Sequence, residues 1–207
     1  MKYSIKKQFE ESWKTKNYWD WYSLLIKRRI RFLKGKVLDI GCGTGELLQF
    51  YRNAIGIDMH NDAIRVCKQK GFKVLRMDAQ NLKFKSNSFD SIHSNSVLDH
   101  LENPGKALKE THRVLKPNGI LYMTLNDVST RGEKWHEDPT HISPFTKKTI
   151  IEALEKARFK VERINWIPYK PPLAQILRFL PSLFVWICYA YGQIVKRQLE
   201  IIARPIK

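Results

Sequence analysis

The chain has 207 residues, of which 43% are hydrophobic and 28% are charged. This balance excludes an intrinsically disordered chain and predicts a single globular domain, residues 1–207, with a substantial core. The 37 lysines and arginines against 20 aspartates and glutamates give a formal net charge of +17. Such a charge either favours anionic partners, such as nucleic acid or a membrane surface, or only maintains solubility.

The positions of the charged residues and cysteines indicate where the protein resides and where its positive charge lies. Residues 1–36 carry eleven lysines and arginines against three acids, and residues 156–207 carry ten against two. The stretch after Met1 is polar and basic, without the apolar run of a secretory signal. Cys42, Cys67 and Cys188 are few and scattered, which argues against a disulfide framework. We therefore expect a basic protein of the cytoplasm.

Helix-like and strand-like segments alternate along the chain. A helical, aromatic-rich segment is predicted to end near Gly35. The strands that follow are predicted at residues 36–40, 54–58, 73–77, 88–95, 119–126, 159–167 and 197–206. The helices are predicted at residues 44–53, 61–70, 105–115 and 146–157. This alternation predicts an α/β, Rossmann-like, doubly wound sheet whose ligands lie at the carboxyl ends of the strands.

Four parts of the domain can be distinguished by composition. They are an N-terminal helical cap (1–35), a Rossmann-like core (36–170), an apolar helical insertion (171–195) and the last strand (196–207).

The stretch VLDIGCGTGE, residues 37–46, carries three glycines directly after the first predicted strand. Glycine permits positive φ and lets backbone N–H groups approach a ligand. Asp58 ends the second strand, 19 residues after Asp39, where an acid reaches ribose hydroxyls in this type of fold. Glu46 would repel a pyrophosphate but suits a cationic ligand, so charge favours S-adenosylmethionine over a dinucleotide.

Four segments together resemble the class I S-adenosylmethionine-dependent methyltransferases of the small-molecule type. VLDIGCGTGE matches the family's first motif, and GIDMHNDAI matches its acidic loop. MDAQNLKFKSNSFD resembles the adenine loop, and VLDHLENPGKALKETHRVLKPNGILYMTLND resembles the segment from strand four to strand five. The resemblance covers residues 36–166 and implies six parallel strands and one antiparallel strand, in the order 3-2-1-4-5-7-6.

The resemblance also implies a cofactor site for S-adenosyl-L-methionine. The backbone around the first glycines would bind its methionine part, Asp58 its ribose, Met59 and Asp78 its adenine, while Cys42 is a small filler and no nucleophile. Tyr18, from the aromatic N-terminal segment, is expected to cover the cofactor. The expected cofactor-binding residues are Asp39, Gly41, Cys42, Gly43, Gly45, Asp58, Met59, Asp78, Ala79, Asn95 and Tyr18.

Residues that act on the methyl acceptor should follow strands four and five. Positioning supplies much of the rate, and a base is needed only if the acceptor loses a proton. His141 is our first candidate and His100 our second, against the alternative that both only pack or position helices. His141 lies in NDVSTRGEKWHEDPTHISPFT, which reads as a long polar loop without secondary structure that ends at Thr146, the expected N-cap. A metal site here lacks a third fixed ligand, so none is predicted.

The insertion PPLAQILRFLPSLFVWICYAYGQIV, residues 171–195, is the most apolar stretch. It is long enough to span a bilayer, but Arg178, Pro181 and the need to return the last strand to the sheet argue against a crossing. A lid, a dimer interface and a hairpin in peripheral contact with a membrane remain open. We expect methyl transfer to a small, hydrophobic or lipid-like acceptor. The alternatives are a tRNA or RNA methyltransferase and a non-catalytic cofactor-binding protein.

Overall fold

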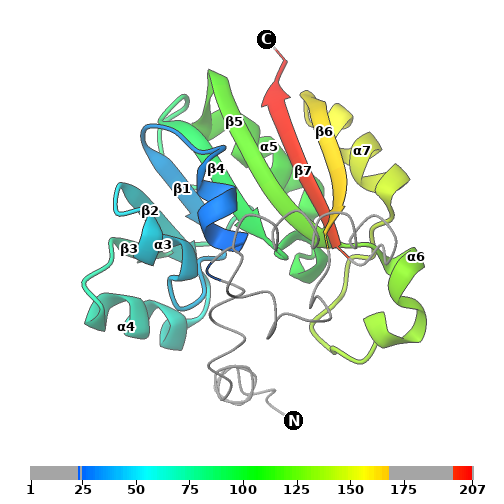
Figure 1. Ribbon diagram of the computed structural model, residues 1–207, viewed down its shortest axis with the longest axis horizontal. Coiled ribbons are helices and arrows are strands. Elements are labelled where there is room, and N and C mark those ends of the chain that lie inside the picture. The colour runs from blue at the N-terminus through cyan, green and yellow to red at the C-terminus, as the bar shows by residue number, and fades with distance from the viewer. Residues whose placement is uncertain (1–22, 24, 168–197, 207) are drawn as a thin grey trace, which may run out of the picture.

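The computed structural model describes residues 23, 25–167 and 198–206. They form a seven-stranded sheet in the order β3-β2-β1-β4-β5-β7-β6, in which β7 is antiparallel to both neighbours and the other pairs are parallel (Figure 1). The strands are β1 (Val37–Ile40), β2 (Ala54–Asp58), β3 (Val74–Arg76), β4 (Phe89–Asn95), β5 (Leu115–Asn126), β6 (Phe159–Ile167) and β7 (Gln198–Pro205). The predicted fold class and strand order are confirmed.

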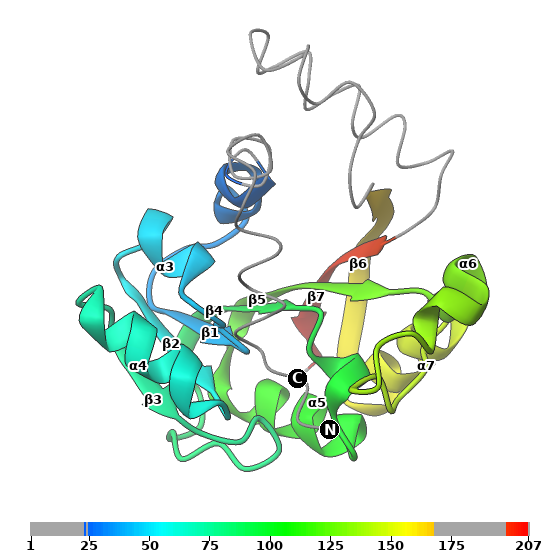
Figure 2. The same cartoon turned by 90° about the horizontal axis from the view of Figure 1, so that it is seen from below.

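Helices cover both faces of the sheet (Figure 2). One core lies between the sheet and α5 (Pro104–Val114) and α7 (Lys147–Lys156). The other lies between the sheet and the helical residues 25–30, α3 (Glu46–Phe50) and α4 (Asn61–Gln69). Because both faces of the sheet are covered, all four residues of β1 are buried.

Local capping signals fix the helices that follow β4 and β5. Asn103 is the N-cap of α5 and accepts a hydrogen bond from the Lys106 N–H, with Pro104 as the first helical residue. Thr146 is the N-cap of α7, as expected, and forms a capping box with Thr149.

Three local predictions are wrong. The first helix ends at Ile30, before Gly35. β5 begins at Leu115 rather than at residue 119, because the turn sequence KPNG forms an irregularity in the ladder with β4. The segment after β5 contains α6 (Val128–Arg131) and a 3₁₀ helix η2 (Gly132–Trp135).

Asp127 is the N-cap of α6, the first of these short helices. One of its carboxylate oxygens accepts from Ser129 N and caps α6, and the other accepts from Lys147 N at the start of α7. Asp127 is buried, so a single side chain fixes both ends of the segment between β5 and α7.

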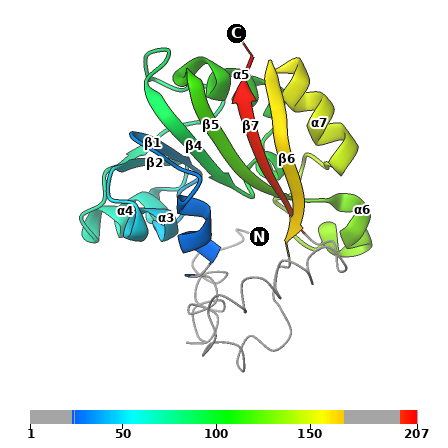
Figure 3. The same cartoon turned by 45° about the horizontal axis from the view of Figure 1, so that its top comes forward.

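The carboxyl ends of the parallel strands share one edge of the sheet, which is the lower edge in Figure 1. β7 starts at this edge, where Gln198 pairs with Asn126 on one side and Ile167 on the other. α6 lies beside the same end of β6 (Figure 3). Tyr18 and the apolar insertion 171–195 lie outside the described residues. Within those residues, no helix has the length and apolar character needed to cross a membrane.

Candidate functional site

The loop between β1 and α3 is a tight turn that depends on glycine. Gly41, Gly43 and Gly45 have φ values of 67°, 51° and 88°, all in the left-handed region. A Cβ added at Gly41 would collide with the side chain of Val97. All three positions therefore favour glycine because of their backbone conformation, and Gly41 also has no space for a larger side chain.

Asp58 ends β2 directly beside this loop. Its Oδ2 accepts a hydrogen bond from Gly43 N at 3.0 Å, and its Oδ1 accepts one from His60 N at 2.9 Å. Asp58 is partly exposed, and the next side chain, Met59, is 48% exposed although it is apolar. An acid beside the glycine loop, next to an exposed apolar side chain, suits a ribose followed by a flat base.

The chain after β3 runs past the same point. Met77 N donates to Asp58 O at 3.1 Å. This bond brings the next residues, Asp78 and Ala79, to the edge of the sheet formed by the carboxyl ends of the parallel strands. Asp78 is partly buried and accepts from Gln80 N at 2.8 Å, and Ala79 is buried. The roles of Asp78 and Ala79 in binding adenine stay predictions.

Asn95, the last residue of β4, is tied to the N-terminal helix. Its Oδ1 accepts from Arg29 Nη1 at 3.0 Å and from the Thr124 hydroxyl. Arg29 is only 2% exposed, an unusual burial for a guanidinium. The neighbouring Arg28 donates two hydrogen bonds to the carboxylate of Glu200, a fully buried residue of β7. These arginines fix the end of the N-terminal helix against the carboxyl edge.

Asp39 lies in β1, beneath the loop. Its carboxylate is 2.6 Å from His93 Nδ1 on the adjacent strand β4, and both side chains are buried. The His93 ring stacks against Tyr122, whose hydroxyl donates to Glu200. Asp39 thus belongs to a buried polar row across β1, β4, β5 and β7, and its contact with cofactor stays a prediction.

Two further side chains of the glycine loop region are shielded from water. Cys42 is buried, and a thiol hydrogen bond with Cys67 together with burial raises its pKa far above the ordinary range. Burial also raises the pKa of Glu46, against the lowering effect of hydrogen bonds from its own backbone and from Thr44. Cys42 therefore behaves as an inert filler, as the sequence suggests.

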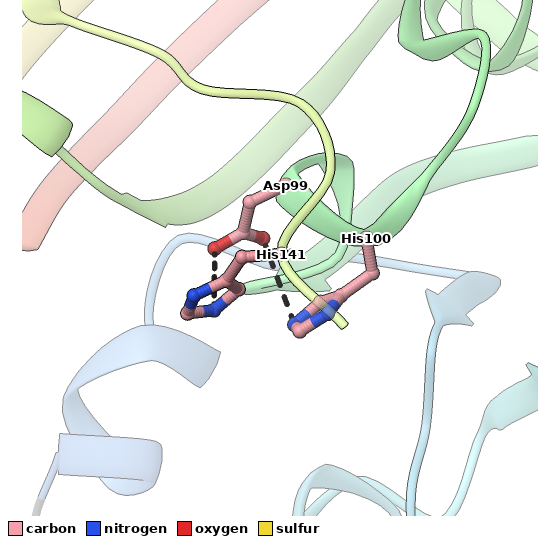
Figure 4. Close-up of side chains that lie close together, drawn as sticks. All are labelled: Asp99, His100 and His141. Atoms are coloured by element: carbon pink, nitrogen blue, oxygen red, sulfur yellow. Dashed lines mark ion pairs between the residues drawn. The ribbon is translucent and has the colours of Figure 1, made fainter. Parts of the chain in front are cut away.

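Asp99, His100 and His141 lie close together (Figure 4). We call these three residues the Asp99 cluster. Asp99 and His100 come from the 3₁₀ helix η1 (Leu98–His100) after β4, and His141 comes from the segment before α7. His141 Nε2 is 3.6 Å from Asp99 Oδ2, and His100 Nε2 is 3.9 Å from Asp99 Oδ1.

Backbone bonds hold the two parts of the cluster together. Ile142 N and Ser143 N both donate to the carbonyl oxygen of Asp99, at 2.9 and 3.0 Å. The His141 ring stacks on Trp135 of η2, at 5.1 Å between centroids and 18° between planes. The segment around His141 is therefore a fixed part of the site.

Asp138 borders the cluster, with its Oδ2 3.9 Å from His141 Nε2. Burial opposes ionisation of this carboxyl, but hydrogen bonds from the Thr140 hydroxyl and N–H outweigh it, and its pKa lies below the ordinary value. His136, in the same segment, is exposed and points its ring edge against Trp135 instead.

The sequence alone did not reveal three buried polar residues that hold predicted site residues or the N-terminal helix: Arg29, His93 and Glu200. Arg29 stands in the basic run KRRIR, where nothing distinguishes it from its neighbours. His93 could have been found, because it is the ladder partner of Asp39 once β1 and β4 are placed side by side.

The residues of the glycine loop fit S-adenosylmethionine. The loop has left-handed glycines, Asp58 offers a carboxylate for hydroxyls, and Met59 offers an exposed apolar side chain. Glu46 and Asp39 put two acid groups next to the loop, against one cation, Lys70, whose Nζ donates to Thr44 O at 3.0 Å. This excess of acid suits a cationic ligand without phosphate.

Comparisons with known proteins agree with this geometry. Residues 38–123 match the family model described as a methyltransferase domain. An uncharacterised protein of Methanocaldococcus jannaschii is 33% identical over 142 residues, which cover 65% of this chain and 68% of that protein. A tRNA (carboxymethyluridine(34)-5-O)-methyltransferase of Arabidopsis thaliana is 34% identical over 122 residues, which cover 56% of this chain and 28% of that protein.

The fold is shared with solved structures. The crystal structure of a SAM dependent methyltransferase from Archaeoglobus fulgidus superposes with a TM-score of 0.73 at 22% identity, covering 97% of this chain and 100% of that one. Together with the glycine loop and the strand order, these matches show that the chain belongs to the class I S-adenosylmethionine-dependent methyltransferases, a family of enzymes whose cofactor is S-adenosyl-L-methionine.

Proposed function

We propose that this chain transfers a methyl group to a hydrophobic, lipid-like acceptor that carries a polar head. One observation carries the proposal: Ile167 and Gln198, which flank the apolar sequence 171–195, are paired at the carboxyl edge of the sheet. That sequence therefore leaves and re-enters the fold where the acceptor must meet the cofactor.

The distribution of charge supports a lipid surface as the source of the acceptor. Residues 37–155 carry 16 lysines and arginines against 15 acids, so they are nearly neutral. The excess of basic residues lies in the two ends of the chain, which include the residues next to the apolar sequence. Basic residues beside apolar ones favour contact with anionic headgroups. We propose a peripheral contact with the membrane through residues 171–195.

The acceptor's polar head has a suitable place beside the Asp99 cluster. Asn126 Oδ1 and Trp135 Nε1 are buried atoms without a hydrogen-bond partner among the described residues. Asn126 donates through its other amide atom to Asp99, and Trp135 stacks on His141, so both atoms adjoin the cluster. An acceptor head group that supplies one donor and one acceptor would satisfy them.

The residues of the site divide into two groups by role. Asp58, Asp78 and the glycine loop bind and orient the cofactor, which supplies a methyl group made electrophilic by the sulfonium. His141 and His100 lie after β4 and β5, so we place the acceptor's nucleophilic atom beside them. Positioning of the two reactants in line supplies most of the rate.

A tRNA acceptor is the second candidate. The Arabidopsis relative named above acts on tRNA by its printed name, and a net charge of +17 suits a polyanion. A tRNA enzyme requires basic side chains leading to the pocket, whereas the contacts described above for the Asp99 cluster are with carboxylate, aromatic and amide side chains.

Label transfer distinguishes the two candidates. The protein is incubated with methyl-labelled S-adenosylmethionine and, separately, with the lipid extract and the tRNA fraction of one cell lysate. We expect label in the lipid extract and none in tRNA, with Asp58→Ala as the control that lacks the cofactor site. Label in tRNA alone would overturn the lipid acceptor, and failure to bind the cofactor in calorimetry would overturn methyl transfer itself.

Membrane contact is measured independently by sedimentation with vesicles. We expect the protein to bind phosphatidylglycerol vesicles more strongly than phosphatidylcholine vesicles, and binding to weaken as salt is raised. Equal, weak binding to both would remove the argument from charge.

A further inference from the structure

The Asp99 cluster places one carboxylate and two imidazoles around a common point. One atom of each residue can be chosen so that all three atoms lie within 4.8 Å of one another. Ligand atoms bound at about 2.1 Å around a tetrahedral ion are ~3.4 Å apart. His141 Nε2 is 3.6 Å from Asp99 Oδ2, and His100 Nε2 is 3.9 Å from the other oxygen, Oδ1. Each separation exceeds the tetrahedral spacing by half an ångström or less, and each is too long for a hydrogen bond.

The hydrogen bonds of the His100 and His141 rings determine which ring nitrogen carries the proton and which one directs a lone pair toward Asp99. His141 Nδ1 is 2.8 Å from the carbonyl oxygen of Trp135. His100 Nδ1 is 3.1 Å from the carbonyl oxygen of Thr140 and 2.9 Å from its hydroxyl oxygen, whose own proton is donated to Asp138 Oδ1 at 2.6 Å. A carbonyl only accepts, so both Nδ1 atoms carry the proton. In the neutral rings both Nε2 atoms then present lone pairs toward Asp99, and histidines that ligate metals are typically oriented by such Nδ1–H bonds.

The carboxylate of Asp99 is itself incompletely satisfied. Asp99 is 0% exposed, its Oδ2 accepts from Asn126 Nδ2 at 3.2 Å, and its Oδ1 has no hydrogen-bond partner among the described residues. A buried carboxylate oxygen facing lone pairs is unfavourable unless a positive charge lies between them. This third ligand is the one that the sequence alone did not supply.

We propose that the Asp99 cluster binds one divalent cation of the Zn²⁺, Co²⁺ or Mn²⁺ kind, through Asp99, His100 and His141. Imidazole nitrogens suit these ions better than Mg²⁺ or Ca²⁺, which prefer oxygen ligands. Three protein ligands leave at least one position for an exogenous oxygen. His100, whose side chain is 34% exposed, is the ligand on the open side of the cluster.

The chemical use of the cation rests on the proposed function. A hydroxyl of the acceptor's head bound to the cation loses its proton to solvent, because a bound cation lowers the pKa of such a group. The oxygen's electron pair then forms the bond to the methyl carbon while the carbon–sulfur bond breaks and its electron pair stays on sulfur. The histidines in this scheme hold the cation and do not act as bases.

Cation binding is tested directly, without any acceptor. Tag-free protein freed of metal by chelation is titrated with Co²⁺, followed by its visible absorption, and with Zn²⁺, followed by calorimetry. We expect one ion per chain for each metal, with competition between the two and no comparable binding of Mg²⁺.

Two near-isosteric variants and one matched control locate the ion. Asp99→Asn keeps the volume of the side chain, and His100→Gln changes a partly exposed residue, so both are expected to fold with unchanged cofactor affinity. Each should weaken cation binding by about 100-fold or more, as loss of a ligand exceeds the 10- to 100-fold effect of an outer-shell change. His136→Gln, in the same segment but outside the cluster, should leave it unchanged.

Absence of stoichiometric binding by the wild-type protein would overturn the proposal, as would equal binding by the wild-type protein and both variants. If the cluster is only an ion pair between protonated histidines and Asp99, the wild-type protein will show no stoichiometric binding. Cation binding without methylation of lipid would leave this site established and refute the proposed acceptor. Lipid methylation at an undiminished rate after chelation would instead refute the role of the cation and leave the acceptor established.

Discussion

Replacement of Asp58 by alanine tests the cofactor site most directly. The carboxylate of Asp58 holds two backbone N–H groups, those of Gly43 and His60, at 3.0 and 2.9 Å. It stands at the end of β2 with Met59 exposed beside it. The substitution therefore removes both the predicted partner of the ribose and one of the anchors of the glycine loop.

The expected size of the effect follows from these bonds. A hydrogen bond to a charged group contributes about 1.5–3 kcal/mol. Two ribose hydroxyls on one carboxylate then contribute about 3 kcal/mol or more, which corresponds to a Kd raised about 100-fold. Because Asp58 is partly exposed, loss of its own backbone bonds should lower the Tm by no more than about 4 °C.

Calorimetry with S-adenosylmethionine and thermal melting measure the two quantities on the same protein. Asp62→Ala is the matched control, since it removes an acid four residues away that forms only an exposed pair with Arg65. It should change neither the Kd nor the Tm appreciably. A Kd for Asp58→Ala within about threefold of the wild-type value, which is under 1 kcal/mol, would refute the placement of the ribose.

Three further substitutions test the framework of the site. Glu200→Gln should destabilise the protein by about 2–3 kcal/mol in urea melting, because it breaks a bidentate pair of Arg28 with a fully buried carboxylate; a loss below about 0.5 kcal/mol would show that the pair is neutral. Gly41→Ala should cost about 2 kcal/mol in the same assay and weaken cofactor binding, because its φ is 67° and its Cβ has no space. The pKa of Glu110 is lowered, chiefly by hydrogen bonds from Arg113, so its contribution to stability is complete above its ordinary pKa of about 4.5 and is lost as pH falls through the lower folded value. Melting of Glu110→Gln between about pH 3 and 6 should show a flatter acid limb than the wild type, and parallel curves would contradict this.

Most of the fold could be predicted because its signals are local. β2 and β6 have the predicted bounds. β2 is a short apolar run that ends at the acid Asp58, whereas β6 is an edge strand in which apolar and polar residues alternate on either side of a register shift. The N-cap Thr146 is likewise visible as a hydroxyl at the start of a periodic stretch. By contrast, α6 and η2 are four-residue elements, too short for a periodic pattern. The buried Asp127 that caps α6 also accepts from Lys147 N, 20 positions further along the chain, and no local pattern displays that contact.

The candidate site likewise contains features that local sequence patterns predict and features that depend on tertiary contacts. Glycines with positive φ and the acid of Asp58 follow directly from the spacing along the chain. The burial of Arg29 depends on its contact with Asn95, which lies 66 positions further along the chain. The Asp99 cluster likewise depends on a contact between Asp99 and His141, which are 42 positions apart. Such contacts exist only after the sheet has been assembled, so the histidines could be named from the sequence but their shared partner could not.

The pairing of Ile167 with Gln198 has a consequence for how this enzyme can change during evolution. The two ends of the segment between them are already held side by side by the sheet, so closing a longer or shorter segment there adds little entropy cost. Insertions and replacements at this point leave the ladders of β5, β6 and β7 intact. A cofactor-binding core of this kind can therefore acquire a new acceptor by exchange of one segment, while the residues that recognise S-adenosylmethionine stay where they are.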